Sequence, residues 1–160
     1  MITSKLQNII NDQITAEMWS SNLYLQMSYF LKHKGWDGFA HWMKIHSEEE
    51  REHATRMADF LTERGGQVKI NMINLVPEGW GSVKDVFEHA LNHEKTVSKM
   101  IDNIVLHAIE VQDFATENFF RTFVDEQVEE EALFGGVVDK LTMAGDAGLL
   151  FLDSQLGKRQ

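Results

Sequence analysis

Residues able to bind metal ions recur along this sequence at positions that a helical pattern assigns to a buried core. They are Glu17, Glu50, His53, Glu94, Gln127 and Glu130. Burying a polar side chain costs free energy unless it is paired, and several buried carboxylates repel one another and tend to protonate. A bound cation removes both penalties, so these residues together predict a metal centre.

The types of ligand indicate which metal ions would bind. Carboxylate oxygens with an imidazole, in a chain without cysteine, suit iron or manganese, whereas Mg²⁺ and Ca²⁺ prefer a cage made only of oxygens. The four glutamates carry about four negative charges, which two divalent cations would balance, and His53 would ligate as a neutral imidazole. We therefore predict a dinuclear centre, where two ferrous ions could bind O₂ between them and each supply electrons.

A different interpretation of these residues is a buried polar network without metal. A single Glu-x-x-His motif, such as Glu50 with His53, is weak evidence for a metal, because such a pair usually lies on the solvent-exposed surface of its helix. The metal interpretation is favoured here because polar residues interrupt four separate helical core faces at matching levels.

The helices that must position these residues are predicted from apolar residues spaced three and four apart and from stretches without glycine or proline. We expect one domain over residues 1–160, with helices at about 4–34, 37–64, 82–110, 113–143 and 146–156. A single helix from 82 to 143 would be on the order of 90 Å long, too long for one compact domain. We therefore place a break near Val111–Asp113, with Asp113 as the candidate N-cap.

The lengths of the connections predict how the helices are arranged. Short turns make the first two helices antiparallel, and likewise the third and fourth. Residues 65–81 could span about 55 Å when extended, which is enough to travel the length of the bundle. The predicted fold is all-α: a four-helix bundle in which a long crossover makes the second and third helices parallel, followed by a short fifth helix.

Counting from the turns predicts that the polar residues meet. Residues equally far from a tight antiparallel turn lie at the same level, and the midpoint of Glu17 and His53 is Gly35 in the first turn. The midpoint of positions 94 and 128 is position 111, in the second predicted break. If the two hairpins pack side by side, all six residues fall in one layer.

The composition limits the classes of partner and location. The net charge of −10 disfavours nucleic acid and anionic membranes as partners, and the absence of cysteine excludes disulfides and thiolate sites. No apolar run is long enough to span a membrane, and no signal peptide is recognisable at the start. We expect a cytoplasmic protein.

Three segments resemble the bacterial non-haem ferritins: 16–24, 48–53 and 125–131. In the ferritin-like di-iron arrangement, two helices each supply a glutamate and the other two each supply Glu-x-x-His. Here the last motif reads Gln127-x-x-Glu130, an asymmetric form that is similar to the non-haem ferritins. Bacterioferritins carry a second histidine and a haem-ligating methionine directly after the glutamate of the second helix. That position is Arg51 here, so no haem is expected.

The resemblance implies an iron-storage protein with ferroxidase activity, which oxidises Fe(II) with O₂ or peroxide and keeps ferric mineral inside a cage of 24 chains. By position, Glu17, Glu50 and His53 would hold the first iron, with Glu50 bridging to the second. The second iron would be held by Glu94 and Glu130, with Gln127 as a further candidate ligand.

Further residues acquire expected roles from the same resemblance. A third iron site would use Glu49, Glu126 and Glu129 together with Glu130, although the three could also form a solvated acidic face. Tyr24 lies seven residues after Glu17 on the same face, where it would hydrogen-bond a ligand, donate an electron, or simply pack in the core.

The remaining histidines are not expected to ligate. His46 precedes Glu50 by four residues and is interpreted as a core or pathway residue. Surface or interface positions are expected for His33, His41, His89, His93 and His107.

Two other functions are considered. A non-storing di-iron oxidase or peroxidase of the rubrerythrin type would use the same bundle, but such proteins often carry cysteine pairs, which this chain lacks. A non-catalytic cage subunit is disfavoured because Glu17, Glu50, His53 and Glu130 are all present.

Overall fold

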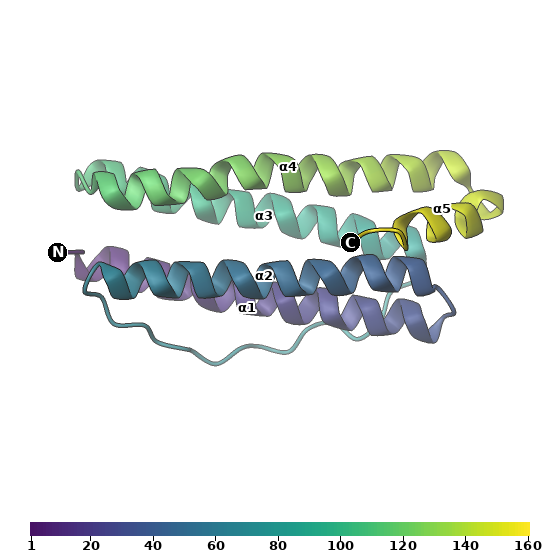
Figure 1. The fold of residues 1–160 in the computed structure, drawn as a ribbon, viewed down its shortest axis with the longest axis horizontal. Coiled ribbons are helices and arrows are strands. Elements are labelled where there is room, and N and C mark those ends of the chain that lie inside the picture. Colours follow the sequence, from purple (N-terminus) through teal and green to yellow (C-terminus); the bar gives the residue numbers. More distant parts are fainter.

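The computed structural model describes residues 1–160 as a four-helix bundle with one short additional helix (Figure 1). The helices are α1 (Ser4–His33), α2 (Asp37–Glu63), α3 (Val83–Glu110), α4 (Phe114–Ala144) and α5 (Leu149–Leu156). The all-α fold class predicted from the sequence is confirmed. The predicted fifth helix differs at its start, because residues Asp146–Gly148 form a 3₁₀ turn before α5 begins.

The ends of the helices are fixed by local side chains. Thr3 and Ser82 accept hydrogen bonds from Leu6 N (3.3 Å) and Asp85 N (3.1 Å), and so cap α1 and α3. A positive φ of 89° at Gly35 reverses the chain between α1 and α2, a conformation that costs glycine little.

The crossover runs along the outside of the α1–α2 pair for the length of the bundle and leads into α3 (Figure 1). Helix α2 is therefore parallel to α3, while α1 pairs with α2 and α3 pairs with α4 in antiparallel fashion.

Helix α5 docks on the first turn of α2. Asp153 accepts a hydrogen bond from Phe39 N at 2.8 Å. A Cβ atom on Gly38 would lie 1.7 Å from the carbonyl oxygen of Asp153, so only glycine permits this approach. The chain after α5 then returns toward the middle of α2 (Figure 1).

The core consists of two apolar clusters separated by a polar layer. One cluster includes Tyr24, Phe39 and Phe134, and the other includes Ile10, Met57, Ile101, Phe120 and Phe123. Between them lie buried polar residues from all four long helices, Glu17, Glu50, Glu94 and Gln127. No helix is both long and apolar enough to cross a membrane.

The turn between α3 and α4 is joined to the end of α2 by an ion pair. Asp113 caps α4 by accepting from Thr116 N at 3.0 Å, and it also accepts from Arg64 Nη1 and Nη2 at 2.9 and 3.2 Å. Burial would raise the pKa of Asp113, but the bonds from Arg64 and Thr116 outweigh burial and hold the pKa below its ordinary value.

We expect Asp113→Ala to lower the free energy of unfolding by about 1 kcal/mol or more, because a helix cap is lost along with the partner of Arg64. A carboxyl group with a depressed pKa stabilises the fold above its unfolded pKa, about 3.9, and this contribution is lost as pH falls through the folded value. Calorimetric unfolding should therefore show a lower free energy of unfolding for Asp113→Ala than for the parent at neutral pH, and a smaller difference in acid. Asp113→Asn keeps a cap acceptor and should lose less; equal transitions in all three proteins would contradict this role.

Candidate metal centre

Glu17 of α1 and Glu50 and His53 of α2 form the first candidate ligand group, with one possible ligand atom of each lying within 4.8 Å of the others. His53 Nδ1 is 3.4 Å from Glu50 Oε2 and 3.9 Å from Glu17 Oε2. Both glutamates are only 2% exposed. The three-residue spacing of Glu50 and His53 places both on one face of α2, and the α1–α2 turn brings Glu17 to the same level.

Glu94 of α3, Glu130 of α4 and His46 of α2 form the second group, again within 4.8 Å of one another. His46 Nε2 lies 2.7 Å from Glu130 Oε2 and 3.9 Å from Glu50 Oε1. Since Glu50 Oε2 faces His53, the two oxygens of Glu50 are directed to different groups. Glu50 therefore occupies a bridging position between them.

Hydrogen bonds fix the orientation of the carboxylates. Glu94 accepts from the hydroxyl of Tyr24 on one oxygen and from Gln127 Nε2 at 3.0 Å on the other. Gln13 Nε2 donates to Glu17 Oε1 at 2.8 Å. Polar groups that orient metal ligands in this way tune the ligands and fix their positions.

The electrostatics of the layer are unfavourable without a cation. Burial, reinforced by the charge of Glu50, raises the pKa of Glu17 well above its ordinary value. Burial also raises the pKa of Glu50 and of Glu94, where the bonds from Tyr24 and Gln127 oppose it. For Glu130, contact with His46 outweighs burial and lowers the pKa. Burial and the nearby carboxylates raise the pKa of Tyr24, so its hydroxyl remains a donor.

Three buried atoms in these groups lack a hydrogen bond of good geometry: Glu17 Oε2, His46 Nε2 and Glu130 Oε2. The latter two are 2.7 Å apart, so distance alone would allow a bond between them, but their relative orientation is poor. Buried polar atoms are normally satisfied, and those that are not call for a partner from outside the protein. A pair of divalent metal ions fits, because the donors are carboxylate oxygens with imidazole nitrogen.

The three glutamates expected at a third iron site line a hollow of about 460 Å³ beside His53 and Glu130. These glutamates are Glu49, Glu126 and Glu129. Two of them already have cationic partners: Arg159 Nη2 lies 2.8 Å from both oxygens of Glu49, and Arg56 Nη1 lies 3.0 Å from Glu126 Oε1. The hollow is therefore partly neutralised by the chain itself, unlike the buried layer.

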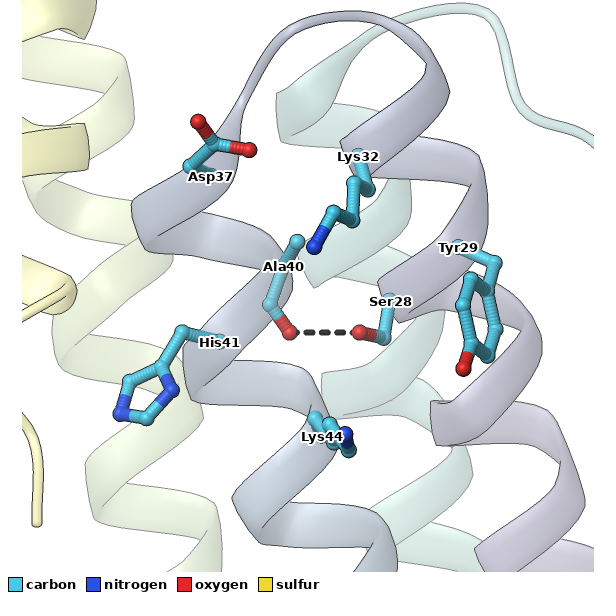
Figure 2. Close-up of a pocket in the computed structure, with 7 residues that line it drawn as sticks. All are labelled: Ser28, Tyr29, Lys32, Asp37, Ala40, His41 and Lys44. Atoms are coloured by element: carbon cyan, nitrogen blue, oxygen red, sulfur yellow. Dashed lines mark hydrogen bonds between the residues drawn. The ribbon is translucent and has the colours of Figure 1, made fainter.

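A second hollow, of about 420 Å³, lies at the α1–α2 turn and shares no residue with the carboxylate groups (Figure 2). Ser28 donates to the carbonyl of Ala40 at 2.6 Å there, between Lys32 and Lys44. The ammonium groups of Lys32 and Lys44 make this hollow unsuited to binding cations.

The structure brings together all six core residues singled out from the sequence, and it adds others. His46 is fully buried, as expected, but it also contacts Glu130. His93, expected at a surface or interface position, is half-buried and lies 2.7 Å from Ser20 Oγ. Its pKa is lowered to about 4, chiefly by burial. Nothing in the sequence indicated the positions of Arg56 and Arg159 beside the acidic hollow.

A family model described as a ferritin-like domain matches residues 7–144. The chain belongs to the ferritin family. A bacterial non-haem ferritin of Bacteroides fragilis is 56% identical over 159 residues, covering 99% of this chain and all of the relative. A probable bacterial non-haem ferritin-like protein of Haemophilus influenzae is 35% identical, with 98% and 96% covered.

Among solved structures, the open pore ferritin of the archaeon Archaeoglobus fulgidus superposes with a TM-score of 0.99 at 42% identity, covering both chains completely. A closed form of that ferritin, engineered by mutagenesis, gives 0.98 at 43% identity, with 100% of this chain and 99% of the other covered. These matches confirm the resemblance inferred from the sequence motifs.

We expect Glu17→Gln to stabilise the metal-free ferritin, because it removes a buried charge while the new amide oxygen can still accept from Gln13. A carboxyl whose folded pKa is raised contributes stability at low pH that is lost as pH rises through the folded pKa. The gain should therefore grow with pH and raise the melting temperature by roughly 2–4 °C for each kcal/mol.

Thermal unfolding with and without divalent metal tests this expectation. Metal should raise the transition of the parent more than that of Glu17→Gln, because a ligand has been removed. Glu48→Gln removes the same charge from an exposed position of α2 and should behave like the parent. A metal-free Glu17→Gln protein that melts below the parent would refute the charge argument.

Proposed function

We propose that this ferritin oxidises Fe(II), its substrate, at the paired carboxylate groups and stores the ferric product as mineral in a cage of 24 chains. The single observation that carries the proposal is the bridging position of Glu50 between two buried ligand groups. Two ferrous ions held side by side can each give one electron to the same oxidant.

The first ion would be held by Glu17, Glu50 and His53, and the second by Glu50, Glu94 and Glu130. Gln127 and Tyr24 would act on the second ion through Glu94, whose two oxygens they hold. Four carboxylates balance two divalent ions, so the bound pair relieves the repulsion that the layer has without metal.

The oxidation step balances with O₂ or with hydrogen peroxide as the oxidant. Two Fe(II) ions lose one electron each, and O₂ takes up two electrons and two protons to give H₂O₂; with peroxide as oxidant, the O–O bond breaks and two waters form. Iron would reach the centre through the acidic hollow, which His53 and Glu130 line.

Storage in a cage is supported by the family and by exposed apolar side chains that a lone bundle leaves uncovered. They lie near the end of α3, at the start of α4, on α5 and on the crossover, and they are Leu106, Phe114, Leu150, Phe151, Met72 and Leu75. Large apolar patches on a surface are typical of sites of association. A non-storing di-iron oxidase or peroxidase is the alternative, since the centre alone would serve both functions.

His53→Ala should reduce the rate of Fe(II) oxidation by more than about tenfold, since even residues that only orient metal ligands contribute factors of about 10–100. The rate is measured as the growth of ferric absorbance after Fe(II) is mixed with air-saturated protein. His33→Ala, at an exposed position, is the matched control and should keep the parental rate. Oxidation by His53→Ala at the parental rate would mean that the site is assigned to the wrong residues.

Storage is tested by size-exclusion chromatography with iron detection after aerobic loading with a large excess of Fe(II). Twenty-four chains of 18.4 kDa would elute as a particle of about 440 kDa, and iron far beyond three ions per chain should elute with it. A small oligomer with about two irons per chain would instead support the non-storing oxidase.

A further inference from the structure

Arg159, in the short segment after α5, is held by five contacts over α2. Its Nη2 donates to both oxygens of Glu49 at 2.8 Å, and its Nη1 lies 3.0 Å from His46 Nδ1 and 3.4 Å from the carbonyl of Trp42. The guanidinium also lies over the ring of Trp42, 4.6 Å from its centroid. The backbone is fixed as well, because His41 Nε2 donates to the carbonyl of Arg159 at 2.7 Å. Only 18% of the Arg159 side chain is exposed, so Arg159 is an integral part of the fold.

The contact with His46 determines where that ring carries its proton. A guanidinium can only donate, so Nδ1 of His46 must accept, and the proton of the ring lies on Nε2. A proton on Nδ1 could instead point to Glu49 Oε2, but that distance is 3.5 Å, longer than the 3.0 Å between Nδ1 and Arg159 Nη1. The N–H groups of His46 and Arg159 would then also point at each other. The protonated Nε2 lies 2.7 Å from Glu130 Oε2, although the orientation of the pair is poor for a hydrogen bond. A protonated ring nitrogen has no lone pair to offer a metal ion, and the lone pair of Nδ1 faces Arg159.

The contact with Glu49 has a similar consequence. Both oxygens of Glu49 are engaged by one nitrogen of Arg159, and charge-assisted pairs of this kind are among the stronger hydrogen bonds. A metal ion entering the hollow beside Glu130 would meet the positive charge of the guanidinium at Glu49, and it would gain most from binding Glu49 only if the guanidinium moved away.

We propose that Arg159 is a specificity-determining residue that keeps Glu49 and His46 out of the set of metal ligands, and so limits the centre to two tightly bound ions. The proposal rests on the proposed function, since it assumes that Glu17, Glu50, His53, Glu94 and Glu130 hold those two ions. Arg159 acts as a counter-ion supplied by the chain at the position where a third cation would bind.

The test is the number of Zn(II) ions bound per chain, measured by calorimetric titration of the assembled protein, because zinc is redox-inactive and accepts the same ligands. The variant is Arg159→Met, which keeps an unbranched apolar stem against Trp42 but has no donor. The matched control is Lys158→Met, which removes the same charge from the neighbouring exposed residue. Two ions per chain are expected for the parent and for the control, and three for Arg159→Met.

Crystals soaked in zinc, with anomalous scattering at the zinc edge, locate the ions. In Arg159→Met the additional ion should contact Glu49, and the double variant with Glu49→Gln should return to two ions. In the zinc-loaded parent, Arg159 should still pair with Glu49, an observation that is independent of how well any variant assembles.

The outcomes separate this inference from the proposed function. Two ions in Arg159→Met, or a parent that binds a third ion at Glu49 with Arg159 displaced, would overturn the role of Arg159 and leave the ferroxidase centre standing. A parent whose zinc does not bind Glu17, Glu50 and His53 would overturn the proposed function, and the present inference with it.

Discussion

The burial of several glutamates in one layer of the bundle is the constraint on which the rest of the structure depends. Glu17, Glu50 and Glu94 come from three helices and are at most 2% exposed, and Glu130 completes the layer from α4. Because desolvation disfavours their charged forms, the layer costs stability until a cation binds. The apolar clusters on either side must therefore hold the helices together through their own packing.

Neutral groups orient these carboxylates without cancelling their charge. Gln13 holds Glu17, and Tyr24 and Gln127 hold Glu94, so the ligands are oriented before a metal ion arrives. Such preorganisation is typical of functional sites, where local stability is lost in favour of binding. The unsatisfied carboxylate oxygens of Glu17 and Glu130 are the direct sign that the arrangement serves an external cation.

The acidic hollow next to the layer differs from it in how the negative charges are compensated. Its residues Glu49 and Glu126 are paired with Arg159 and Arg56, so the chain supplies the cations there. An external cation therefore has most to gain in the deep layer, where no lysine or arginine contacts the carboxylates, and less in the hollow, where it must compete with guanidinium groups. This difference in charge compensation separates the two regions more sharply than the number of glutamates in each.

The sequence by itself determined the four long helices, the crossover and the six inward-facing polar residues. These features depend on local periodicity, on glycine and proline breaks, and on counting from the turns, and the ends of the four long helices differ from those predicted by at most one residue. Only the tertiary structure decided the burial of His93 and the place of Arg159, whose partners lie 110 to 118 positions away in the chain. The docking of α5 against Gly38 determines where Arg159 lies. Side-chain contacts over such separations leave no periodic pattern in a sequence.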